Sequence, residues 1–81
     1  MDTWEHIKGC KEMLDEVAEE VNLKVFLKTY DQPKPNGKFL KITEILLFDE
    51  NGNFVYRSYD NVSTILGFID GIQSSYRPNK T

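Results

Sequence analysis

The chain has 81 residues and a net charge of −3, and 40% of its residues are hydrophobic. This length has room for one hydrophobic core, so we expect a single domain over residues 1–81, with a frayed tail at about residues 77–81. The apolar content favours a packed fold over disorder, and no apolar run approaches the roughly 18 residues of a membrane span.

Apolar residues between positions 3 and 21 recur at steps of three and four, which predicts one amphipathic helix. Asp2 or Thr3 is suited to cap its first turn. Gly9 lowers the helix propensity by about 1 kcal/mol relative to Ala. We interpret the acidic residues of this helix as a solvated face, with mimicry of a phosphate backbone as the alternative. They are Glu12, Asp15, Glu16, Glu19 and Glu20.

Three strands are predicted next along the chain. The first covers residues 23–31 and the second residues 38–48, separated by a loop over residues 32–37 that contains two prolines and an Asn-Gly pair. A turn at residues 49–53 then leads into a third strand over residues 54–59.

A second helix follows, capped by Asp60 or Asn61, with an apolar stripe that includes Val62, Ile65 and Ile69. The order is therefore α-β-β-β-α. Two amphipathic helices and one sheet with an aliphatic face pack most simply as a two-layer α+β sandwich. We expect a three-stranded antiparallel meander with both helices on one face, which leaves the other face open.

The first strand carries two different rows of side chains, because strand side chains alternate between faces. Val25, Leu27 and Thr29 form an aliphatic row suited to the core. The other row is basic and aromatic and has no evident structural role, so it is the best candidate binding surface. Its members are Lys24, Phe26, Lys28 and Tyr30.

On the second strand we expect Phe39, Lys41 and Ile45 to join this open face. Leu40, Ile42, Leu46 and Phe48 form the other row of this strand. Glu44 interrupts that row, and we expect it to mark a bulge or a sheet edge.

The open face fits three interpretations. Aromatic side chains among long polar ones are typical of a protein interface, which predicts a protein partner or a homodimer. Lysines interleaved with aromatic rings also suit single-stranded nucleic acid, and an ordinary solvated sheet face is the third interpretation. The acidic net charge favours a protein partner, because phosphate binding depends on accumulated positive charge.

Catalysis finds little support in the sequence. His6 is the single histidine, and its i, i+4 spacing from Cys10 is better explained by helix packing than by a metal site or a Cys–His pair. The glycines occur singly and form no phosphate-binding loop. We therefore expect a non-enzymatic protein with no catalytic residues, no metal, no cofactor and no small-molecule substrate.

The location of the protein is predicted from its start and from its one cysteine. The first five residues lack the basic region and apolar segment of an export signal. Cys10 has no second cysteine for an internal disulfide, which fits a reducing compartment. We expect a cytoplasmic protein.

Two resemblances follow from these patterns. The α-β-β-β-α order is that of double-stranded-RNA-binding domains, but the start of the second helix, residues 60–65, lacks the basic residues by which those domains bind. The C-terminal third contains the Gly52-Asn53 turn, Asn61-x-Ser63 and Phe68-Ile69-x-x-Ile72. In these positions it resembles small phage-encoded inhibitors of bacterial defence, anti-CRISPR proteins among them. It implies a phage- or prophage-type protein that inhibits a host defence protein by occluding a surface of it.

Overall fold

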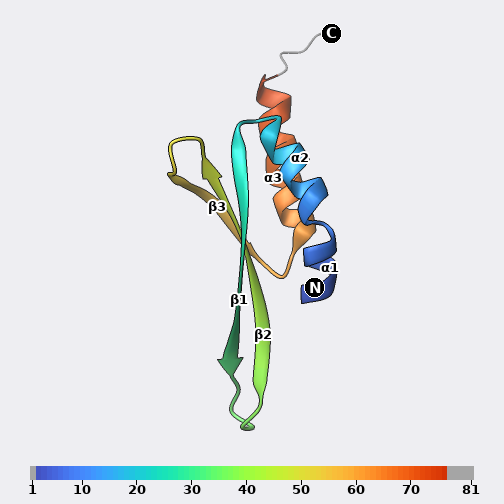
Figure 1. The fold of residues 1–81 in the computed structure, drawn as a ribbon, viewed down its shortest axis with the longest axis vertical. Coiled ribbons are helices and arrows are strands. Elements are labelled where there is room, and N and C mark those ends of the chain that lie inside the picture. Colours follow the sequence, from blue (N-terminus) through green and yellow to red (C-terminus); the bar gives the residue numbers. More distant parts are fainter. Residues whose placement is uncertain (1, 77–81) are drawn as a thin grey trace.

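The computed structural model describes residues 2–76, which form an open three-stranded antiparallel sheet with its helices on one face (Figure 1). This confirms the predicted two-layer α+β sandwich in the order α-β-β-β-α. The predicted frayed tail at residues 77–81 lies outside the described residues. The elements are α1 (Trp4–Gly9), α2 (Lys11–Glu19), β1 (Leu23–Pro33), β2 (Phe39–Asp49), β3 (Phe54–Tyr59) and α3 (Val62–Tyr76).

The first helix differs from the prediction, because the single helix expected over residues 3–21 is divided at Cys10. The Cys10 N–H is shared between the carbonyl oxygens of His6 and Ile7, at 3.1 and 3.0 Å, so the chain tightens there. Gly9, whose helix propensity is low, immediately precedes this point. The predicted apolar stripe stays buried across the break, in Ile7, Leu14, Ala18 and Val21.

β1 and β2 form a hairpin whose register is set by a short turn. The Lys34 N–H donates to the Lys38 carbonyl at 2.8 Å, and Gly37 takes a φ of 84°, which glycine adopts without strain. This turn is shorter than the predicted loop, so β1 runs further than expected and β2 begins and ends one residue later. The resulting register places Phe26 opposite Leu46.

The far half of this hairpin extends beyond the helices as a two-stranded arm, defined here as residues 28–41 (Figure 1). Every residue of the arm is exposed, and the molecule measures 55 × 26 × 21 Å along its principal axes. A two-stranded ribbon without a covered face is marginally stable by itself. The arm is also basic, with Lys28, Lys34, Lys38 and Lys41 against Asp31.

The hydrophobic core lies between the helices and the covered face of the sheet. Beside β3 it is closed by Tyr56, whose ring stacks on Phe68 with 4.3 Å between centroids. Within residues 2–76, no helix combines the length and apolar character needed to cross a bilayer. The largest fully buried hydrophobic side chains are Ile7, Leu14, Ile45, Leu47, Ile65 and Ile69.

Asp60 ends the three-stranded part of the sheet. Its N–H donates to the Thr43 carbonyl at 2.8 Å, and its carboxylate accepts the Thr43 N–H at 2.9 Å. The side chain thus replaces the backbone partner that β3 would have supplied. Asp60 is buried and has a φ of 51°, a left-handed conformation that Asp and Asn tolerate better than most residues.

The N-terminal segment is tied to the same corner. The Asp2 N–H donates to the Asp60 carbonyl at 2.7 Å, and the Asp2 carboxylate accepts the Val62 N–H at 2.7 Å. The Asn61 carboxamide oxygen accepts the Thr64 N–H at 3.0 Å, as the predicted cap requires. The first amides of α3 are therefore satisfied by Asp2, from the start of the chain, and by Asn61, from the residue just before the helix.

We expect the substitution Asp60→Ala to lower the free energy of unfolding by about 1–3 kcal/mol, because it leaves the buried Thr43 amide without an acceptor. Asp60→Asn keeps an acceptor oxygen and tolerates the same φ, so its loss should be smaller. Asp70→Ala, at an exposed position of α3, is the control and should change stability by less than about 0.5 kcal/mol. Urea denaturation measures all three, and equal stability of D60A and D70A would contradict this role of Asp60.

Candidate binding surface on the open face of the sheet

The sheet face that points away from the helices, called the open face here, carries the row predicted in β1. Phe26 and Tyr30 keep 52% and 38% of their surface accessible, whereas Val25, which points to the helix side of the sheet, is buried. The predicted alternation is therefore confirmed at Val25 and Phe26, whereas Leu27 is half-buried and Thr29, predicted for the core, is exposed because it belongs to the arm. The binding role of the row stays a prediction. Its members, all exposed, are Lys24, Phe26, Lys28 and Tyr30.

Phe39, Lys41 and Ile45 do not lie on the open face, so their predicted placement is wrong. The hairpin register sets Phe26 opposite Leu46, so the even-numbered residues of β2 share the open face and the odd-numbered ones face the helices. Ile45 is fully buried in the core. Phe39 and Lys41 are exposed because they belong to the arm, which extends beyond the helices (Figure 1).

Three further aromatic side chains on the open face were not predicted as site residues. Phe48 contacts Phe26 edge-on with 5.4 Å between ring centroids, and Phe54 contacts Phe48 at 6.0 Å. Phe54 and Tyr59 on β3 are half exposed, at 50% and 52%. The observed turn pairs Lys34 with Lys38 and is therefore centred on Asn36. A two-residue turn at the Asn36-Gly37 pair would instead set Phe26 opposite Leu47, so this turn signal did not reveal the register. We call Phe26, Phe48, Phe54 and Tyr59 the aromatic patch.

Glu44 lies in the middle of the open face and is buried, whereas it was expected at a bulge or an edge. Its carboxylate accepts a hydrogen bond from Arg57 Nη1 at 2.6 Å, which makes a buried acid on a central strand tolerable. This hydrogen bond is the main cause that raises the pKa of Arg57. The guanidinium also lies 5.1 Å from the Phe54 ring centroid and 5.8 Å from that of Tyr59. Glu44 therefore holds a cation over the aromatic patch.

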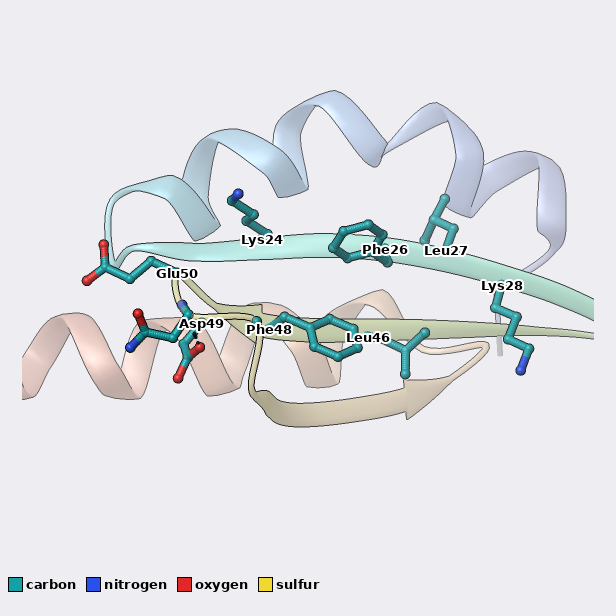
Figure 2. Close-up of a pocket in the computed structure, with 10 residues that line it drawn as sticks. Lys24, Phe26, Leu27, Lys28, Leu46, Phe48, Asp49 and Glu50 are labelled. Carbon is teal, nitrogen blue, oxygen red and sulfur yellow. Dashed lines mark hydrogen bonds between the residues drawn. The ribbon is translucent and has the colours of Figure 1, made fainter.

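A groove of about 670 Å³ runs along the open face beside the β2–β3 turn (Figure 2). Phe26, Leu46 and Phe48 supply its apolar lining, and Lys24 and Lys28 of β1 add positive charge. The β2–β3 turn contributes the carboxylates of Asp49 and Glu50 and the backbone of Asn51 and Gly52 to the lining. This open-face groove is lined by Lys24, Phe26, Leu27, Lys28, Leu46, Phe48, Asp49, Glu50, Asn51 and Gly52.

The residues weighed for catalysis are His6 on α1 and Cys10 at the C-terminal cap of that helix, and neither lines the groove. His6 Nε2 lies 3.7 Å from Cys10 Sγ and 3.8 Å from Asp2 Oδ1. Both contacts use the same ring nitrogen, whereas a nucleophile–His–Asp relay needs one partner on each nitrogen. In the part of the chain that the structure describes, no three His, Cys, Asp or Glu side chains are grouped to hold a metal ion. The open face is the stronger candidate site.

Comparisons with known proteins do not place the chain in a family. Neither the protein-family models nor the curated proteins nor the solved structures give a match. The resemblance to phage-encoded inhibitors therefore stays a prediction.

The β2–β3 turn, which borders the groove, is organised by Asp49. Its Oδ1 accepts the Asn53 N–H at 2.8 Å and the Asn51 N–H at 2.9 Å, and Gly52 takes a φ of 85°. These hydrogen bonds, that of the Asn53 backbone first, lower the pKa of Asp49 below its ordinary value of 3.8. The unfolded chain therefore binds this proton more readily than the folded chain, so the bonds stabilise the fold above pH 3.8 and are lost as the pH falls further.

We expect Asp49→Asn to be less stable than the parent chain at pH 7, since the charged acceptor of two amides is lost. The difference should narrow as the pH falls below 3.8, because the parent Asp49 then becomes neutral as well. Glu50→Gln removes the same charge from the same turn without touching these hydrogen bonds, so its loss at pH 7 should be smaller. Thermal unfolding between pH 7 and pH 2.5 measures the stability of the parent chain, D49N and E50Q. If the difference in stability between D49N and the parent chain stays the same over this pH range, the charge of Asp49 does not have this role.

Proposed function

We propose that the chain is a non-catalytic protein-binding module that docks through the open face of its sheet. The observation that carries this proposal is the aromatic patch with Arg57 held over it by Glu44. Aromatic side chains and arginine are the residues that supply most of the binding energy at protein interfaces.

The arrangement of charge around the patch supports a protein partner. Lys24 and Lys28 of β1 line the groove together with Asp49 and Glu50 of the β2–β3 turn, so the apolar centre has a mixed polar rim. Such a rim steers a partner and sets its orientation, while the centre contributes most of the affinity. A rigid sheet also presents these rings with little loss of conformational entropy.

Occlusion is the mode of action that suits such a module. A face without catalytic groups acts by covering a surface of its partner, which is what the predicted inhibitor of a host defence protein would do. In this proposal the acidic outer side of α2 is a second contact surface for the partner. The partner is either a different protein or a second copy of the chain, which would form a homodimer through the open face.

We expect the double variant Phe26→Ala/Phe54→Ala to weaken partner binding about 30-fold or more, because two central anchors are truncated. Both side chains are half exposed, so the fold should persist. Phe39→Ala is the matched control, since Phe39 is 68% exposed but lies on the other face. Affinity capture from extracts of the source cells, followed by titration of the purified partner, measures the effect.

The same double variant tests the homodimer. If the chain pairs with itself through the open face, sedimentation velocity should show a dimer that F26A/F54A converts to monomer and that F39A leaves intact. The proposal fails if F39A abolishes binding or self-association while F26A/F54A retains both.

The arm favours binding of single-stranded nucleic acid as a second candidate function. Four lysines against one acid make this end of the molecule basic, although the whole chain is acidic. Lys28 and Tyr30 lie beside the aromatic patch, on which bases could stack. A single-stranded nucleic acid bound in this way would run from the arm onto the open face.

For this second candidate we expect the affinity for a short oligonucleotide to fall steeply with salt. Lys28→Ala/Lys38→Ala should reduce the slope of log K against log salt by roughly 1.4, about 0.7 for each lost phosphate contact. Lys8→Ala, on α1, is the control and should leave the slope unchanged. Fluorescence anisotropy at several salt concentrations measures it, and binding that is absent or indifferent to salt removes this candidate.

A further inference from the structure

We propose that the free edge of β1 binds an extended segment of the partner protein as a fourth strand, with apolar and basic side chains alternating along that segment. This inference rests on the proposed protein-binding function and specifies its mode and the chemistry of its partner.

The first observation is that β1 is an edge strand. The sheet order is β1-β2-β3, so among the described residues β1 pairs with β2 alone. It is 11 residues long, whereas β3 at the opposite edge has six. The outer side of an edge strand offers a row of backbone N–H and C=O groups that another strand can bind.

The second observation is that grooves flank this edge on both sides. The open-face groove lies on one side. A second groove of about 450 Å³ lies on the helix side, between α2 and the start of β1. Lys24, Phe26 and Glu50 line both grooves, so the space passes around the edge of β1. We call the second one the helix-side groove, and it is lined by Asp15, Glu19, Asn22, Leu23, Lys24, Val25, Phe26 and Glu50.

The two grooves differ in chemistry, and this difference selects the partner. Side chains of an added strand alternate between them, because successive residues point to opposite faces of a sheet. Those on the open face lie beside Phe26 and the aliphatic stems of Lys24 and Lys28, and Leu46 and Phe48 follow one strand further in, which favours apolar residues. Those on the helix side meet Asp15, Glu19 and Glu50, which favours Lys or Arg.

Part of the acidic charge on the helix side is already compensated. Lys11 Nζ lies 2.8 Å from Asp15 Oδ2, and Lys24 also lines the groove. Glu19 and Glu50 leave the groove acidic. In this arrangement the backbone hydrogen bonds and the apolar contacts supply the affinity, and the charges select the side chains and their register.

A second copy of the chain fits this edge poorly. An antiparallel pairing of two β1 edges needs a twofold axis perpendicular to the sheet, which brings the two helical layers side by side. When the pairing is centred at the helix-side groove, near Lys24, Asp15 and Glu19 of one copy approach the same acids of the other, and like charges in contact are unfavourable. The charge of the helix-side groove therefore favours a different protein.

The test uses synthetic peptides of about six residues, the usual length of a strand. One alternates Leu with Arg, a second alternates Leu with Glu, and a third has the Leu/Arg composition with the alternation broken. A fourth is the Leu/Arg peptide with alternate amides N-methylated, which removes the backbone donors. Fluorescence anisotropy gives the affinities, and hydrogen exchange of the β1 amides locates the binding.

We expect the alternating Leu/Arg peptide to bind and to protect β1 amides, and the other three peptides to bind at least about tenfold more weakly. Glu19→Lys should weaken the Leu/Arg peptide about 2- to 10-fold. Glu12→Lys is the matched control, because Glu12 lies on the same helix but lines neither groove, and it should have a smaller effect.

Three results would overturn the added strand. Binding without protection of the β1 amides places the peptide elsewhere. Binding that survives N-methylation or broken alternation is not strand addition. Protection that grows with protein concentration in the absence of peptide means that a second copy occupies the edge.

A fourth result separates this inference from the proposed function. If the captured partner depends on Phe26 and Phe54 but leaves the β1 amides unprotected, the chain is a protein-binding module without strand addition. If the partner is insensitive to F26A/F54A, the proposed function itself fails.

Discussion

The register of the β1–β2 hairpin is the constraint on which the rest of the structure depends. With Phe26 opposite Leu46, the odd-numbered residues of β1 and β2 lie on the helix side of the sheet and the even-numbered ones form the open face. A shift by one residue would move Ile45 from the core to solvent and bury a row that contains Glu44. The short turn from Lys34 to Lys38 holds this register, so a few backbone hydrogen bonds decide which residues can bind a partner.

The molecule divides into a covered body and an uncovered arm, and the length of β3 sets the boundary. β3 pairs with residues 44–48 of β2, and Asp60 occupies the next position by bonding to Thr43. Beyond that point β2 has no third strand beside it, and the helices end as well (Figure 1). The aromatic patch therefore lies on the body, where the core fixes its backbone, and the lysines of the arm lie on a ribbon with less support.

Much of the fold could be predicted from the sequence, because it depends on local signals. The bounds of β3, the turn before it and the cap at Asn61 follow from turn residues and capping chemistry, and the alternation in β1 follows from its own side chains. The placement of Phe39, Lys41 and Ile45 could not be read in the same way, because it depends on how one strand pairs with another. Burial of Glu44 likewise depends on Arg57, which is distant in the sequence.

The contact between the Asp2 carboxylate and the Val62 amide joins residues that are 60 positions apart. Closing so large a loop costs more chain entropy than forming the hairpins within it, so most of the sheet has to be in place before the contact becomes favourable. We therefore expect the N-terminal segment and the first turn of α3 to come together late during folding. On unfolding, this contact would be lost before the three-stranded part of the sheet that it closes, so the start of α3 would separate from the N-terminal segment while the core strands are still paired.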